Sequence, residues 1–211
     1  MSPSLKWVVL TVMVGASCKG AAPRSAKGPT GAASSSGLTQ APTGPADLPP
    51  MPPYPEAVRG RLAVQSAGPP GTQQIARDWV AKAGVCETPP MMQIKGEQPG
   101  AGGTLVLLAV PENKITSYPV TLVAQGLPTP PAAQVGVQVY TKTGSFAYQA
   151  QEGSVDVYAF GKTVSGRFAV TLREINSNAR LRYAGAFREV PVVQLDPAFC
   201  APAAAGAKPR Q

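Results

Sequence analysis

Residues 163–188 read TVSGRFAVTLREINSNARLRYAGAFR, and this stretch decides the fold class. Its first half alternates strictly between two sets of side chains. One set is apolar or glycine: Val164, Gly166, Phe168, Val170 and Leu172. The other set contains Ser165, Arg167, Ala169, Thr171 and Arg173. A period of two predicts a β-strand with one face toward a core and one toward solvent.

The second half of the stretch repeats this pattern. We expect Leu181, Tyr183, Gly185 and Phe187 to point inward, with Arg180, Arg182, Ala184 and Arg188 outward. The segment between the halves, residues 174–178 (EINSN), is a credible hairpin connection. Gly166 and Gly185 inside strands indicate either a bulge or close packing against an aromatic ring.

Similar short strands recur on both sides of this hairpin. The candidates are 59–66, 91–97, 104–110, 115–123, 134–141, 145–151, 154–160, 163–173, 179–188 and 190–195. One segment, 72–84, has helical spacing, because Ile75, Trp79 and Ala83 fall at i, i+4 and i+8. The predicted fold is mainly β, an antiparallel β-sandwich or small barrel with one short α-helix.

The pattern of inward glycines and apolar residues between 134 and 195 resembles small β-sandwich domains of uncharacterised bacterial envelope lipoproteins. That resemblance implies no catalytic residues.

The composition leaves room for one such domain. The 211 residues include 24 Pro and 22 Gly, and only 6% are aromatic. We expect a signal peptide over 1–17, the cysteine and a disordered tether over 18–56, a β-rich domain over 57–200 and a disordered tail over 201–211.

The first twenty residues predict export. Lys6 precedes the apolar run 7–14, which is too short to span a bilayer but suits a secretory signal. Gly-Ala-Ser-Cys at 15–18 resembles the lipobox of bacterial lipoproteins, although Gly15 stands where that family usually has Leu. The resemblance implies acylation of Cys18 and membrane anchoring. Because Lys19 replaces the Asp that marks inner-membrane retention, it implies the outer membrane. The alternative is an ordinary cleaved signal with an incidental cysteine.

Residues 19–56 hold nine Pro and no Val, Ile, Phe or Trp. Such a segment cannot bury enough apolar surface to fold, so it predicts a flexible tether whose second half favours polyproline II. The alternative for Pro-Pro-Met-Pro-Pro-Tyr at 49–54 is a ligand for an aromatic-groove domain.

Cysteine usage indicates an oxidising compartment. With Cys18 acylated, Cys86 and Cys200 form an even pair, which in an exported chain predicts a disulfide. Buried thiols and metal ligation are the alternatives. A metal site would need further soft ligands, and the chain has no histidine and no other cysteine.

The residue inventory argues against catalysis. With no His, Ser-His and Cys-His nucleophile pairs are excluded. Lys-Thr-Gly at 142–144 matches a triplet of penicillin-recognising enzymes, but their Ser-x-x-Lys motif is missing, so a turn is the simpler interpretation. We expect no enzyme, no cofactor and no metal.

Charge supplies the remaining candidate site. The net charge is +8, and one face of the two-strand stretch carries arginines: Arg167, Arg173, Arg180, Arg182 and Arg188. Arg173 and Arg180 should oppose each other, which is unfavourable unless a carboxylate such as Glu174 or Glu189 intervenes. The alternatives are a solvated face and a docking surface for an acidic partner, lipopolysaccharide phosphates or an anionic polysaccharide. Export argues against nucleic acid as the partner.

Together these features favour a non-catalytic binding or scaffolding subunit of an envelope assembly for secretion, adhesion or surface motility. Its partners would be the membrane, through Cys18, and other envelope proteins. The second hypothesis is a lipoprotein that binds a small apolar or anionic ligand on or in the β-domain.

Overall fold

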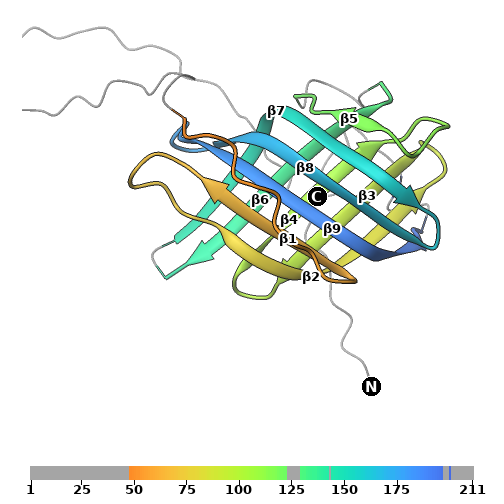
Figure 1. Cartoon of the computed structure of the whole chain (residues 1–211), viewed down its shortest axis with the longest axis horizontal. Helices are drawn as coiled ribbons and strands as arrows, with labels where there is room; N and C mark the ends of the chain where they lie inside the picture. The colour runs from red at the N-terminus through yellow and green to blue at the C-terminus, as the bar shows by residue number, and fades with distance from the viewer. Residues whose placement is uncertain (1–47, 123–128, 143, 197–199, 201–211) are drawn as a thin grey trace, which may run out of the picture. The chain divides into compact units, whose positions relative to one another are not determined.

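The structure is a computed structural model that describes residues 48–122, 129–142, 144–196 and 200. The predicted signal peptide, Cys18 and the predicted tail over 201–211 lie outside these residues. The strands within the described ranges are β1 (Arg61–Ala67), β2 (Ala76–Cys86), β3 (Met91–Gln98), β4 (Gly102–Ala109), β5 (Ser117–Pro119), β6 (Ala132–Thr141), β7 (Gly144–Phe160), β8 (Thr163–Glu174) and β9 (Arg180–Gln194) (Figure 1).

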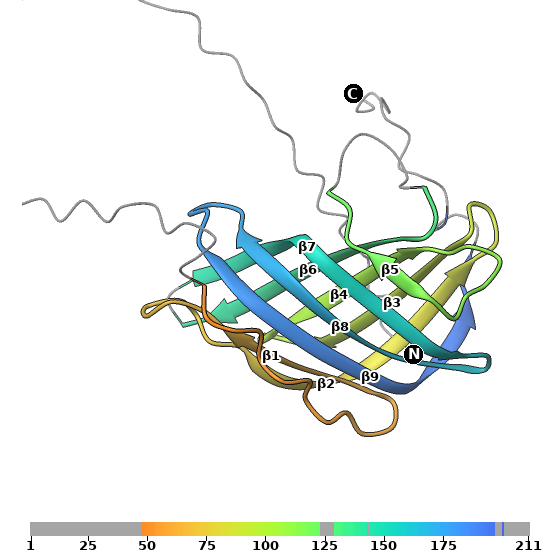
Figure 2. The same cartoon turned by 45° about the horizontal axis from the view of Figure 1, so that its top comes forward.

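Eight of these strands form a closed antiparallel barrel. Neighbours along the chain pair in the order β1-β2-β3-β4-β6-β7-β8-β9, and β9 then pairs with β1 to close the ring (Figures 1 and 2). Of the two predicted β architectures, the structure therefore has the barrel. In a closed barrel both edges of each strand pair with a neighbouring strand, so the barrel lacks the open edges that a sandwich would keep.

The ninth strand, β5, is an excursion between β4 and β6. It pairs with the second half of β7, from Ser117 opposite Asp156 to Pro119 opposite Ser154. It is shorter than the predicted strand over 115–123. Tyr118 is fully buried, and its hydroxyl donates to the Lys114 carbonyl at 2.8 Å. Burial raises the pKa of Tyr118 to about 12.

Two long strands replace two pairs of predicted short ones. The segments 145–151 and 154–160 are parts of β7, and 179–188 and 190–195 fall almost wholly within β9. In β7 the register shifts between Ala150 and Glu152, next to Gly153 at φ 118°. Glu189 in β9 has φ 45°. The polar residues that suggested strand ends therefore lie at bulges and other irregular positions inside long strands. At a bulge an extra residue bends the strand.

The predicted helix over 72–84 is wrong, because most of this segment is β2. Ile75, Trp79 and Ala83 are buried as expected, but Ala81 is buried with them while Val80 and Lys82 are exposed. A spacing of four is a multiple of two, so the apolar stripe fits a strand as well as a helix. Pairing with β1 on one side and β3 on the other favours the strand.

Side chains fill the barrel interior. The largest fully buried residues come from most of the strands: Trp79, Tyr118, Tyr183, Phe168, Phe187, Leu62, Ile75, Met92, Ile94, Leu108, Leu172 and Leu181. Eight strands enclose an interior just wide enough for side chains to fill. The Tyr183 hydroxyl lies 2.6 Å from the Thr104 hydroxyl, so its polar atom is satisfied inside the core. Burial raises the pKa of Tyr183, although this hydrogen bond lowers it in part.

The β8–β9 hairpin follows the predicted pattern. Phe168 lies opposite Gly185 and Phe187 lies opposite Gly166, so each phenyl ring covers the glycine of the neighbouring strand. A Cβ atom added to Gly185 would lie 2.2 Å from Phe168 Cζ, and one added to Gly166 would lie 2.3 Å from Phe187 Cζ. The prediction of close aromatic packing at both glycines is confirmed, and a register shift next to Gly166 adds the bulge.

Lys142 and Gly144 of the Lys-Thr-Gly triplet flank the connection from β6 to β7. Thr141 donates a hydrogen bond to the Gly144 carbonyl at 3.0 Å there.

Among the described residues, no helical segment has the length and apolar character that a membrane span requires.

Candidate functional site

The disulfide predicted from the cysteine count has the required geometry. Cys86, at the end of β2, and Cys200 have their sulfur atoms 2.07 Å apart and their Cα atoms 5.6 Å apart. These values match a protein disulfide. The bond joins β2 to a residue beyond the last strand, at a sequence separation of 114.

The five candidate arginines all lie on the outward-facing side of β8 and β9, but the structure divides them into three groups. Arg173, Arg180 and Arg182 lie together near the β8–β9 turn, since Arg173 is opposite Arg180 and Thr171 is opposite Arg182. Arg167 lies nearer the start of β8, and Arg188 lies just past the middle of β9.

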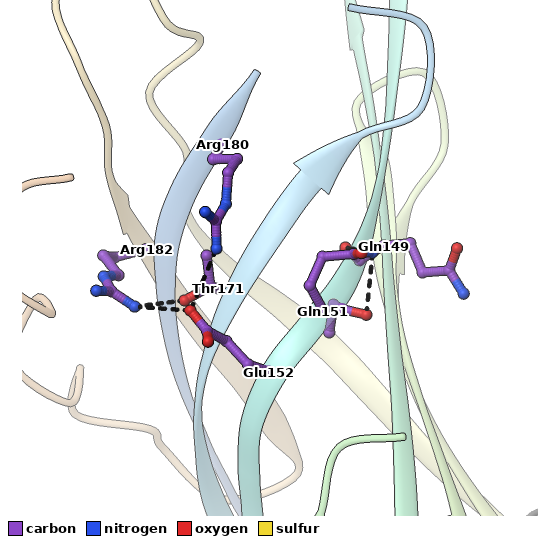
Figure 3. Close-up of polar contacts among 7 residues, drawn as sticks. Gln149, Gln151, Glu152, Thr171, Arg180 and Arg182 are labelled. Carbon is purple, nitrogen blue, oxygen red and sulfur yellow. Dashed lines mark hydrogen bonds and ion pairs between the residues drawn. The ribbon is translucent and has the colours of Figure 1, made fainter. Parts of the chain in front are cut away.

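We call Arg173, Arg180, Arg182 and Glu152 the arginine cluster. Glu152 of β7 is the shared carboxylate: its Oε1 lies 3.3 Å from Arg180 Nη2 and 3.4 Å from Arg182 Nη1 (Figure 3). Arg182 also donates to the hydroxyl of Thr171, which lies between Glu152 and Arg182 in the register. Neighbouring residues on three adjacent strands therefore build one polar surface.

Positive charge exceeds negative charge in the arginine cluster. The cluster contains three guanidinium groups and one carboxylate, a net charge of +2, and the carboxylate contacts only Arg180 and Arg182. Arg173 is exposed, and no ion pair to it occurs within the described residues. Because directly opposite residues have Cα atoms about 4.5–5.5 Å apart, Arg173 and Arg180 repel each other. An anion bound between them would relieve this repulsion and accept charge-assisted hydrogen bonds.

The predicted sources of the neutralising carboxylate are wrong. Glu174 follows the inward parity of β8 and is buried, and its carboxylate accepts hydrogen bonds from the amide and hydroxyl of Ser177. It also lies opposite Tyr148, whose pKa is raised by burial and by this carboxylate. Glu189 lies past the middle of β9, away from Arg173 and Arg180, and its carboxylate is 2.9 Å from Arg59 and 3.7 Å from Arg188.

Sequence reasoning missed Glu152 because it placed this residue in a turn between two strands. Glu152 sits at the bulge of β7, where the register shift sets it opposite Thr171. The only signal in the sequence was an acidic residue next to Gly153. The partner strand that brings it to the arginines becomes known only from the fold.

A cavity of about 270 Å³ lies beside the disulfide. Its lining includes Cys86, Met91, Met92, Phe160 and Lys114. The Lys114 ammonium lies 4.7 Å from the centre of the Phe160 ring, a cation–π contact. The lining also includes Glu87 and Gln194, so the wall is mostly apolar with one cation, Lys114, and one anion, Glu87.

Within the described ranges, no three His, Cys, Asp or Glu side chains lie close enough to hold a metal ion. Comparisons with protein-family models, with curated proteins and with solved structures found no match to this chain.

Proposed function

We propose that this protein is a lipid-anchored, non-catalytic binding subunit of a bacterial outer-membrane assembly. The lipobox-like segment at 15–18 supports an anchor on Cys18, and the pairing of Cys86 with Cys200 is consistent with an exported protein. In this proposal the β-barrel is an interaction module for other envelope proteins, in machinery for surface motility, secretion or adhesion.

The observation that carries the binding role is the filled barrel. Aromatic and aliphatic side chains occupy the interior, so a partner has to be recognised mainly on the outer surface. On that surface the arginine cluster combines excess positive charge with planar guanidinium donors, which suit carboxylate groups. We therefore propose an acidic protein segment as the partner, bound at Arg173, Arg180 and Arg182.

The test is a pull-down after crosslinking in living cells. It compares the wild-type chain with Cys18→Ala and with the triple variant Arg173→Gln/Arg180→Gln/Arg182→Gln. We expect defined envelope proteins with the wild type and a loss of about tenfold or more with the triple variant, since hydrogen bonds to charged groups contribute about 1.5–3 kcal/mol each. Cys18→Ala should also lose them, because the chain is no longer held at the membrane.

The matched control removes three exposed cations elsewhere, in Arg77→Gln/Lys82→Gln/Lys162→Gln. Equal losses in both triple variants would reduce the effect to net charge and contradict a specific site. Recovery of anionic glycan or lipid without protein would contradict the assembly subunit and favour an envelope-surface ligand.

The cavity next to the disulfide favours a second candidate function, binding of a small apolar anion. Octanoate is a suitable probe, because its chain would contact Met91, Met92 and Phe160 while its carboxylate faces Lys114. Phe160→Ala should weaken octanoate binding more than Lys114→Gln, whose exposed ion pair is worth about 1 kcal/mol or less. Calorimetry showing no binding to the wild type at millimolar octanoate would exclude this candidate.

A further inference from the structure

Residues 48–56 (LPPMPPYPE), which we call the strap, include five prolines. Proline fixes φ near −65° and restricts the residue before it to extended conformations, so this sequence strongly favours polyproline II. That conformation has no internal hydrogen bonds. Proline also lacks a backbone N–H group, so the strap mainly needs hydrogen-bond donors from whatever surface it contacts.

The strap runs along the outside of the barrel beside β1 and β9 (orange in Figures 1 and 2). Two adjacent strap residues are held there. Gln65 of β1 donates its side-chain N–H to the Pro53 carbonyl, and the Arg167 guanidinium of β8 lies 4.6 Å from the centre of the Tyr54 ring. Arg167 Nε is also 3.5 Å from Asp156, which orients the guanidinium.

Four alanines lie between these two contacts. The register places Gln65, Ala184 and Ala169 in one row across β1, β9 and β8, and Ala63, Ala186 and Arg167 in the next. We call Ala63, Ala169, Ala184 and Ala186 the alanine wall. Gln65 and Arg167 therefore stand at opposite corners of a patch of small side chains.

The alanine wall faces outward, yet part of it is covered. Leu62 and Val64 flank Ala63 and belong to the core, so Ala63 points away from it; the same parity applies to Ala184. Nevertheless Ala63 is only 4% exposed and Ala184 is 0% exposed. Small side chains let proline rings approach the sheet closely, which longer residues at these positions would prevent.

We propose that the alanine wall, with Gln65 and Arg167, is a recognition site for a polyproline II segment, and that the strap occupies it in cis. Gln65 donates the hydrogen bond that a polyproline carbonyl needs, and Arg167 makes a cation–π contact with an aromatic ring one residue later. The alanine wall packs against the proline rings. The strap is then a separable ligand of the barrel rather than part of its core.

This assignment gives the Pro-rich segment a role that a simple spacer lacks. Where the chain is anchored through Cys18, a point that rests on the proposed function, the docked strap sets the position at which the tether leaves the barrel. Release of residues 48–56 would add about 28 Å of reach at ~3.1 Å per residue.

The test separates the occupant from the site in the full-length chain. Tyr54→Ala weakens the occupant, whereas Gln65→Ala/Arg167→Gln disables the site. A fluorescent peptide of residues 48–58 is added to each variant, and its anisotropy is measured. We expect binding to Tyr54→Ala, at least about fivefold weaker binding to the wild type because its site is occupied, and no binding to Gln65→Ala/Arg167→Gln.

A second readout uses the Glu56–Ala57 bond and a glutamate-specific protease. Tyr54→Ala and Gln65→Ala/Arg167→Gln should both be cut at this bond about fivefold faster than the wild type. The control Arg77→Gln changes an exposed residue of β2 and should be cut at the wild-type rate. Near-UV circular dichroism checks that each barrel is folded. Equal cleavage of all chains, or peptide binding that does not depend on Gln65 and Arg167, would overturn the proposal. None of these readouts requires the anchor or an envelope partner.

Discussion

Gly185→Ala should destabilise the barrel by about 2–3 kcal/mol, although it adds only one methyl group. The new Cβ would lie 2.2 Å from Phe168 Cζ, and the ring is fully buried, so it has no space to move away. Overpacking of this kind costs about 1–3 kcal/mol. The measurement is urea unfolding followed by the fluorescence of the buried Trp79.

The contact itself is isolated by a double-mutant cycle. Phe168→Ala alone should cost about 3–5 kcal/mol through the cavity it leaves. The double variant Phe168→Ala/Gly185→Ala should lose less free energy of unfolding than the sum of the two single variants, by about 1 kcal/mol or more. The reason is that the added methyl group then enters the space that the ring has left.

Gly136→Ala is the matched control. Gly136 also lies within a strand, but an added Cβ would meet nothing nearer than the Tyr148 carbonyl at 4.0 Å. This change should be neutral or slightly stabilising, since alanine restricts the unfolded chain. If Gly185→Ala and Gly136→Ala had the same free energy of unfolding, the ring-over-glycine packing would be refuted.

Loss of the Cys86–Cys200 disulfide should lower the free energy of unfolding by about 4–5 kcal/mol. The bond closes a loop with a sequence separation of 114, and the chain-entropy model assigns that value to loops of this size. The variant Cys86→Ser/Cys200→Ser should therefore unfold at a clearly lower urea concentration than the wild type.

Two comparisons check this interpretation. Wild-type protein reduced with dithiothreitol should unfold like the double serine variant, and Cys18→Ala should unfold like the oxidised wild type. An unfolding midpoint that does not change on reduction would show that the two sulfur atoms contribute nothing to stability.

The prediction of the β8–β9 hairpin succeeded because its information is local. Residues 163–188 contain both strands, their turn and the inward glycines with the rings that cover them, so period-two alternation is sufficient. The disulfide was equally accessible, because a chain with three cysteines allows few pairings.

The errors occurred where the sequence permits two solutions. In β2 the spacing of Ile75, Trp79 and Ala83 fits either a helix or a strand, and the neighbouring strands decide between them. At Glu152 a polar residue beside a glycine resembles a turn, whereas the barrel uses it as a bulge that brings a carboxylate to Arg180 and Arg182.

By itself the sequence determined the mainly β class, the inward and outward faces of the hairpin and the pairing of Cys86 with Cys200. These properties depend on the period of side chains along a strand and on the number of cysteines. Only the tertiary structure decided that the sheet closes, with β1 meeting β9, and that Glu152, Arg180 and Arg182 meet. It also brought Pro53 to Gln65 and Tyr54 to Arg167. The physical reason is that these contacts join residues far apart in the chain, whose proximity depends on strand register and barrel closure rather than on local pattern.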